Sequence, residues 1–264
     1  MATLREEEKE RWKEIKDKPF SYKLEYFWDY YKFAVIGVIV AVLVVIAVIK
    51  TVVNYRDYAL CVVMINTEPI TTDEAAITWA SDLEQLLDVD TDKYQVYFDT
   101  SIMIGNGANS SVEYAAMQKL TAYLTSATMD VYIADTAIFE EYCQNENLYD
   151  LRAVFTEEEL EALDGMIYYT DGATFADYDD ITNIRVSEDQ AQYTVNHHDP
   201  SGMKDPIPMG IFIPEDSRIS NSGAYDLLKD FEKYQGYTPE PVMGIVRNST
   251  HFESAVQTLR YFMK

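Results

Sequence analysis

Cysteine is scarce in this sequence, with only Cys61 and Cys143 among 264 residues. Small extracellular domains that depend on disulfides carry more cysteines in shorter chains. Each of the two cysteines lies in an apolar or helical pattern, where a thiol usually packs as a small apolar group. We therefore expect two separate buried thiols rather than a disulfide scaffold.

Basic side chains are scarce after residue 53. Residues 54–264 hold 12 Lys or Arg against 37 Asp or Glu, a net charge of −25, whereas residues 1–32 hold eight of each sign. An acidic surface of this strength repels phosphate backbones and keeps an exposed domain soluble. We therefore expect no nucleic-acid partner.

The catalytic signatures that a sequence can show by itself are missing. There is no G-x-S-x-G, no H-E-x-x-H and no G-x-x-x-x-G-K-[ST]. His197 and His198 are adjacent, so in an extended chain they point in different directions and rarely share a metal. The run 88–92 spaces three aspartates like a calcium loop, but Lys93 occupies the position of its glycine. We expect a protein that is not an enzyme and that has no cofactor and no metal site.

One long apolar run is present near the N-terminus. Residues 33–49 read FAVIGVIVAVLVVIAVI, and Lys50 with the residues TVV extends the run to 21 residues. About 20 such residues cross a hydrocarbon core as a helix, and a terminal lysine can reach the membrane surface. The run is apolar on all sides, unlike a helix that covers a protein core. We predict a transmembrane helix over 33–53.

The segment before this run is rich in aromatic side chains, as is typical of a membrane interface. Leu24, Phe27, Trp28 and Tyr31 recur at helical spacing. We therefore predict that residues 1–32 are cytoplasmic and juxtamembrane, with an amphipathic helix that lies on the membrane before the chain enters it.

The orientation follows from the flanking basic residues. A cleavable signal peptide does not fit, because the charged leader is 32 residues long and no A-x-A-like site follows. Lys50 and Arg56 are the only basic residues close after the run, whereas four lysines lie close before it. This bias predicts a single-pass signal anchor in the cell membrane, with the N-terminus cytoplasmic and residues 54–264 extracellular.

Strand-like and helical segments alternate after the anchor. Apolar, β-branched runs predict strands at 58–66, 94–103, 130–135, 206–214 and 241–248. Amphipathic stretches predict helices at 72–87, 110–125, 136–143, 156–163, 224–234 and 251–263. This alternation indicates βαβ crossovers, so we predict one α/β domain over 54–264, with a mostly parallel sheet and helices on both faces.

Two phrases in this domain resemble a known family. The stretch from YALCVVMIN to DVYIADTAIFEEYCQNENLYDL resembles the first lobe of bacterial extracellular solute-binding proteins of the type 2 periplasmic fold, and GIVRNSTHFESAVQTLRYFM resembles their closing phrase. Together with the single anchor, the chain also looks like uncharacterised single-pass proteins of Gram-positive bacteria. Met129 stands where the family has proline, and about 54 residues separate LYDL from PIPMG. The resemblance implies one lobe and a reduced second lobe.

Ligands of open α/β sheets bind at the carboxyl ends of the strands. The polar residues predicted at these ends are the candidate ligand-binding residues of the chain, namely Asn66, Thr67, Thr100, Ser101, Asn106, Asp135 and Thr136. Asn106 belongs to the turn GNGANSS, which is either a turn with a helix cap or a loop that contacts the ligand.

The first functional hypothesis is a membrane-tethered, non-catalytic extracellular binding module that engages a small solute, or hands it to a transporter. The alternative is a protein-interaction or assembly subunit of a membrane complex, without a small-molecule ligand. The lipid bilayer is a partner under both hypotheses, and a small solute or a membrane protein is the second partner.

Overall fold

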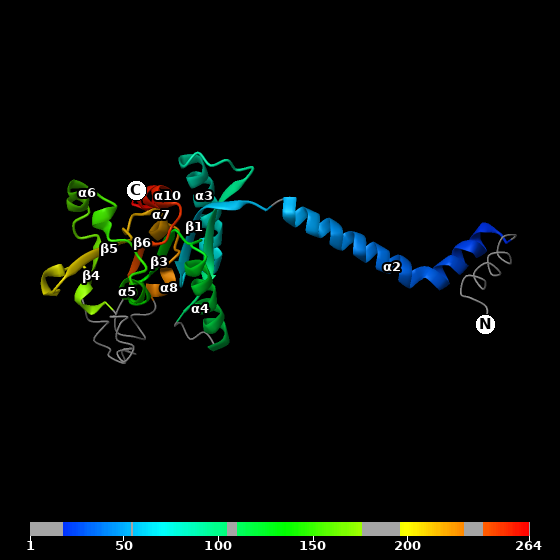
Figure 1. Ribbon diagram of the computed structural model, residues 1–264, viewed down its shortest axis with the longest axis horizontal. Helices are drawn as coiled ribbons and strands as arrows, with labels where there is room; N and C mark the ends of the chain where they lie inside the picture. The colour runs from blue at the N-terminus through cyan, green and yellow to red at the C-terminus, as the bar shows by residue number, and fades with distance from the viewer. Residues whose placement is uncertain (1–17, 54, 105–109, 176–195, 230–239, 264) are drawn as a thin grey trace. The chain divides into compact units, whose positions relative to one another are not determined.

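The computed structural model describes residues 18–53, 55–104, 110–175, 196–229 and 240–263. It separates two compact units, Met1–Tyr55 and Arg56–Lys264. The first unit holds one long helix, and the second holds a sheet with its helices (Figure 1).

The long helix is α2 (Phe20–Val53), with 34 residues. Its part Tyr31–Val53 is the one helix in the described residues that is long and apolar enough to cross a membrane. The predicted span 33–53 is therefore helical, as a membrane anchor requires. The aromatic segment belongs to the same helix and continues into the apolar run, whereas the sequence predicted a separate helix before the span.

The second unit is built on a six-stranded sheet with the strand order β2-β1-β3-β6-β5-β4. The strands are β1 (Asp57–Ile65), β2 (Tyr94–Ile102), β3 (Val131–Asp135), β4 (Ile167–Asp171), β5 (Pro206–Phe212) and β6 (Pro241–Ile245). Strand β1 pairs in parallel with β2 and β3, and the other three pairings are antiparallel. The predicted α/β class is confirmed, and the sheet is mixed because β6 lies antiparallel between β3 and β5.

The main helices of this unit are α3 (Pro69–Leu86), α4 (Ser110–Thr125), α5 (Thr136–Gln144), α6 (Glu157–Ala162) and α10 (Phe252–Phe262). Shorter elements are α7 (Arg218–Asn221), α8 (Asp226–Lys229), η1 (Leu151–Ala153), η2 (Gly172–Thr174) and η5 (Pro200–Gly202). Helices α3 and α4 make the crossovers that parallel pairing of β1, β2 and β3 requires. Of the predicted helix 224–234, residues 226–229 are helical, and 230–234 lie outside the described residues.

The central part of β1 is apolar without a break because successive side chains enter two different hydrophobic clusters. In β1, Leu60, Val62 and Met64 enter the first cluster, and Cys61 and Val63 enter the second. Helices α3 and α10 contribute to the first cluster, and α4 and α5 to the second. Both cysteines are buried and free, as predicted.

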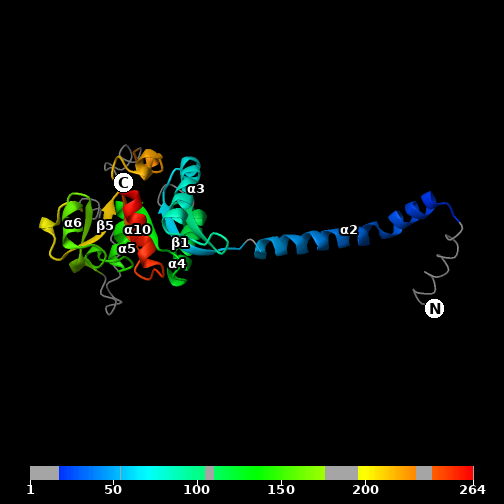
Figure 2. The same cartoon turned by 90° about the horizontal axis from the view of Figure 1, so that it is seen from above.

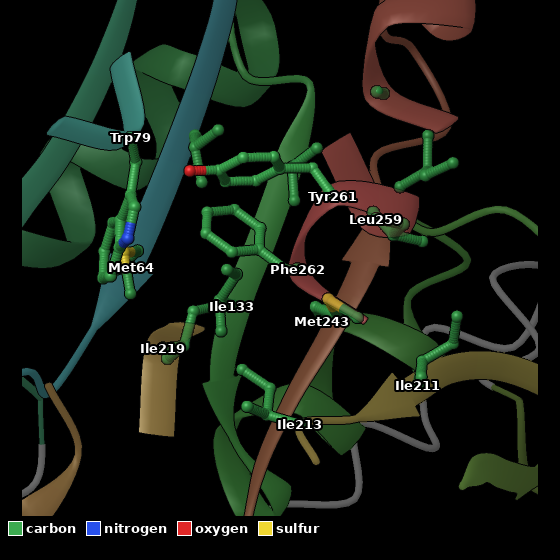
Figure 3. Close-up of a cluster of buried hydrophobic side chains, with 14 of the residues drawn as sticks. Met64, Trp79, Ile133, Ile211, Ile213, Ile219, Met243, Leu259, Tyr261 and Phe262 are labelled. Atoms are coloured by element: carbon green, nitrogen blue, oxygen red, sulfur yellow. The ribbon is translucent and has the colours of Figure 1, made fainter. Parts of the chain in front are cut away.

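An aromatic contact marks the centre of the first cluster. The ring of Phe262 on α10 meets Trp79 on α3 edge-on at 5.3 Å, and Figure 3 shows it close to Ile133 of β3. Helix α10 packs over β6 and β1, which brings the end of the chain across the sheet (Figure 2). Burying rings of this size supplies a large share of the hydrophobic stabilisation of a domain.

Candidate functional site

Three parallel strands end at one edge of the sheet. Strands β1, β2 and β3 run in the same direction, so Asn66, Ile102 and Asp135 lie at their shared carboxyl edge. The antiparallel strand β6 begins at this edge, because Asp135 pairs with Pro241. The structure therefore brings most of the predicted ligand-binding residues to one region.

Asn66 connects the ends of all three strands. Its Nδ2 donates to Asp135 Oδ2 at 3.1 Å and to the Ile104 carbonyl at 3.0 Å, and its Oδ1 accepts from the Ile104 N–H at 2.8 Å. Its φ of 59° is left-handed, a conformation that asparagine adopts more readily than most residues. Asn66 thus fixes the chain that leaves β2 against the ends of β1 and β3.

Asp135 is a buried carboxylate at the start of a helix. Its Oδ1 accepts from the Ile138 N–H at 3.3 Å and caps α5. Burial raises the pKa of the Asp135 carboxyl, although the bonds from Asn66 and the helix N–H groups oppose this shift. The group therefore takes up a proton at a higher pH than an exposed aspartate does.

Two buried threonines lie beside this pair. Thr67 Oγ1 donates to the Thr100 carbonyl at 3.2 Å, which joins the ends of β1 and β2. The Thr100 hydroxyl donates to Asp73 of α3. Next to Asp73, the buried Thr72 Oγ1 has no hydrogen-bond partner in the described part of the chain. This group of hydroxyls has capacity for a further hydrogen bond.

Ser101 is exposed, and its side chain belongs to a second hydrogen-bond network, which is centred on Asp99. Its Oγ donates to Asp99 Oδ1 at 2.7 Å and accepts from Lys119 Nζ at 2.9 Å. Lys119 and the Tyr123 hydroxyl both reach Asp99 Oδ2, at 2.6 and 2.7 Å. Burial alone would raise the pKa of the Asp99 carboxyl, but the bonds from Lys119, Tyr123 and Ser101 outweigh it and hold the pKa below its ordinary value. This network stabilises β2 against α4.

Thr136 contributes its backbone, and Asn106 lies outside the described residues. The Thr136 N–H donates to the Glu240 carbonyl at 3.0 Å, which fixes the residue before β6 to the first residue of α5. The Thr136 carbonyl is 3.5 Å from the Tyr168 hydroxyl. Residues 105–109 of the turn GNGANSS likewise lie outside the described residues.

A buried polar cluster that the sequence did not predict adjoins Thr136. Glu140 of α5 accepts from the Tyr168 hydroxyl and the Thr170 hydroxyl, both at 2.7 Å. The His197 ring stacks on Tyr168 at 4.3 Å, with its Nδ1 2.8 Å from the Tyr169 carbonyl. Burial and the nearby Glu140 raise the pKa of the Tyr168 hydroxyl, which keeps its proton for Glu140. The signal available in the sequence was Glu140 directly after Phe139 and two residues before Tyr142, an acidic residue between aromatic ones.

His198 also lies at the carboxyl edge. Its ring stacks on Phe212 at 3.7 Å, its Nδ1 is 3.1 Å from the Gly165 carbonyl, and its Nε2 is 2.6 Å from Glu240 Oε2. The two histidines therefore point into different surroundings, as the sequence predicted. Among the described residues, no group of three or more His, Cys, Asp or Glu is placed to hold a metal ion.

Comparison of the chain with protein-family models, with curated proteins and with solved structures finds no match. The resemblance to one lobe of a solute-binding protein, with its reduced second lobe, therefore stays a prediction.

Proposed function

We propose that the chain is a non-catalytic binding module, tethered to the cell membrane by α2 and engaging a small solute on its extracellular domain. One observation carries the proposal: buried polar side chains from the ends of β1, β2 and β3 converge at the carboxyl edge of the sheet. This is the edge at which open α/β sheets bind their ligands.

Two further observations support this site. Asp135 is a buried carboxylate, and buried charged groups with raised pKa values occur preferentially at functional sites. The buried Thr72 hydroxyl lacks a hydrogen-bond partner among the described residues, although most buried polar groups in proteins have one. A bound solute or ordered water would satisfy it.

The membrane location rests on the apolar part of α2. The bias of basic residues toward its N-terminal side favours a cytoplasmic N-terminus, with the acidic domain outside. The resemblance to solute-binding proteins suggests delivery of a solute to a transporter. The same resemblance favours helices on both faces of the sheet and a reduced second lobe in the 54 residues between LYDL, which ends at Leu151, and PIPMG, which begins at Pro206.

A thermal-shift screen of the full chain in detergent tests the proposal, with amino acids, short peptides, sugars and metal ions as probes. A solute at 100 times its Kd stabilises the folded domain by about 2.7 kcal/mol, which raises the Tm by roughly 5–10 °C for a domain of this size. Asp135→Asn should abolish the shift. Asp90→Asn, in an exposed turn, should retain it. A ligand whose shift survives Asp135→Asn would place the site elsewhere.

A second candidate function is assembly with a membrane protein. Helix α4 favours it, because Val112, Tyr114 and Met117 are 49%, 66% and 44% exposed. Exposed apolar side chains on one element are common at protein interfaces. A blank solute screen, together with a defined membrane-protein complex that Tyr114→Ser and Met117→Ser dissociate, would establish assembly instead of solute binding.

A further inference from the structure

Strand β2 is one of the two ends of the sheet, and in the described part of the chain no strand lies along its outer side. An unpaired strand edge presents N–H and C=O groups with which another chain can pair. The opposite end of the sheet is covered by the chain itself, because the Tyr169 N–H of β4 donates to the His197 carbonyl at 2.9 Å. The outer N–H groups of β2 need partners of another kind.

A carboxylate occupies the middle of this edge. The Val96 N–H donates to Glu84 Oε1 at 3.1 Å, so it takes no part in the pairing with β1 and lies on the outer side of β2. Glu84 lies near the end of α3, 12 residues before Val96, and the turn between α3 and β2 brings its side chain back to the strand. A hydrogen bond to a carboxylate is roughly twice as strong as a neutral one, and it places a charge where an added strand needs a carbonyl.

N–H groups at the two ends of β2 are also bonded within the domain. At the start, the Tyr94 N–H donates to the Asp90 carbonyl at 2.9 Å. Near the end, the Ser101 N–H donates to Asp99 Oδ1 at 3.1 Å. Between Asp99 and Ile102, β2 has one residue more than β1 has opposite it, which is a β-bulge. A bulge interrupts the regular row of groups that an added strand requires, so the whole length of this edge is protected.

We propose that Glu84 is a gatekeeper residue, which closes the β2 edge to strand addition by a second copy of the chain. The segment that it protects reads YQVYFDTSI, and Asp99 is its one charged residue. Strand-forming segments of low charge pair readily when they are exposed. A second copy is the partner to exclude, because copies tethered to one membrane, as in the proposed function, meet at a high local concentration. The protection itself does not depend on whether a solute binds.

Variants of the full chain in detergent test the proposal, with light scattering after gel filtration as the measure of protein mass. Glu84→Leu removes the acceptor and the charge, and we expect its mass to rise with concentration toward about twice that of the natural chain. Glu84→Gln keeps an oxygen that accepts the Val96 N–H, and it should keep the natural mass. Glu161→Leu is the matched control, because it makes the same change at an exposed position of α6, at the other end of the sheet (Figure 1).

The outcome of the mass measurement decides the role of Glu84. The proposal is overturned if Glu84→Leu keeps the natural mass at every concentration, or if Glu84→Gln or Glu161→Leu associates as Glu84→Leu does. Should Glu84→Leu fail to fold, Glu84→Ala carries the test, because alanine suits a helix interior and also lacks the acceptor. Its mass must then rise with concentration in the same way.

Hydrogen exchange shows which surface the associated chains use. At a protein concentration too low for association, the Val96 N–H should exchange roughly tenfold faster in Glu84→Leu than in the natural chain, because its acceptor is gone. The Tyr94 N–H keeps its acceptor in this variant and should exchange at the natural rate. At a concentration at which Glu84→Leu associates, the Val96 N–H should be protected again, because the added strand supplies a carbonyl. Fast exchange of the Val96 N–H in the associated form would place the contact on another surface and overturn the proposal.

Discussion

The Asn66 amide nitrogen donates to Asp135 Oδ2 at 3.1 Å, and it does so from a backbone φ of 59°. One residue therefore has two structural requirements at the carboxyl edge of the sheet. Its side chain must reach both Asp135 and Ile104, and its backbone must be left-handed. The two requirements can be separated by substitution.

Asn66→Gly removes the side-chain bonds but suits the left-handed backbone, whereas Asn66→Ala removes the bonds and adds strain. We expect Asn66→Gly to lower the free energy of unfolding by about 1–3 kcal/mol, because buried partners lose their bonds. Asn66→Ala should be less stable again by roughly 1 kcal/mol. Urea unfolding followed by the fluorescence of the buried Trp79 measures both values. Equal stability of the two variants would contradict the backbone requirement, and the exposed Asn221→Ala is a control expected to be nearly neutral.

The raised pKa of the Asp135 carboxyl leads us to predict a contribution to the stability of the domain that decreases as the pH rises. Burial raises the pKa of its carboxyl above the value of about 3.9 in an unfolded chain. The folded state therefore binds the proton more readily, and this contribution is fully present below about pH 4 and is lost as the pH rises through the folded pKa. Asp135→Asn should flatten the decrease in Tm with pH above this point. A profile parallel to that of the natural chain would show that Asp135 titrates normally.

For Asp99 we predict the opposite, a contribution to the stability of the domain that increases as the pH rises. Its bonds from Lys119, Tyr123 and Ser101 hold the pKa of its carboxyl below the ordinary value despite burial. Its contribution is therefore present above about pH 4 and is lost as the pH falls through the lowered pKa. Asp99→Asn should lower the Tm at pH 7 and reduce the further loss between pH 5 and 3. Lys119→Met should show the same trend, and a natural chain that is equally stable at pH 3 and pH 5 would contradict the prediction.

The sequence predicts five of the six strands as short apolar runs, but it names no strand at the position of β4. The run of β1 is apolar without a break because both of its faces are buried. The sequence also predicts that Asn66 and Asp135 lie at one edge, since the carboxyl ends of parallel strands share an edge. The antiparallel direction of β6 was not predictable, because an apolar run carries no information about the direction of its neighbours. Nor does any local pattern pair His198 with Glu240, 42 residues apart.

The sequence also did not predict that glycines on β5 and β6 are needed for close packing. A Cβ on Gly210 would lie 2.6 Å from Phe139 Cζ and 2.7 Å from Val242 Cγ1. A Cβ on Gly244 would lie 2.8 Å from the same Phe139 atom. The ring of Phe139 therefore packs directly on the sheet because two strands lack side chains beneath it. The missing side chains of the two glycines allow α5 to lie close to the sheet. Asp135 is the N-cap residue of this helix.

Gly210→Ala should consequently destabilise the domain by overpacking, by about 1–3 kcal/mol in the free energy of unfolding. Phe139→Leu provides room at the same point, so the double variant should lose less stability than the sum of the two single variants. Gly202→Ala is the matched control, because a Cβ there meets nothing within 4 Å and should change stability by less than about 0.5 kcal/mol. Urea unfolding of the four chains measures the coupling. If Gly210→Ala were as stable as Gly202→Ala, the ring of Phe139 would not be seated on the strands, and α5 would owe its position to other contacts.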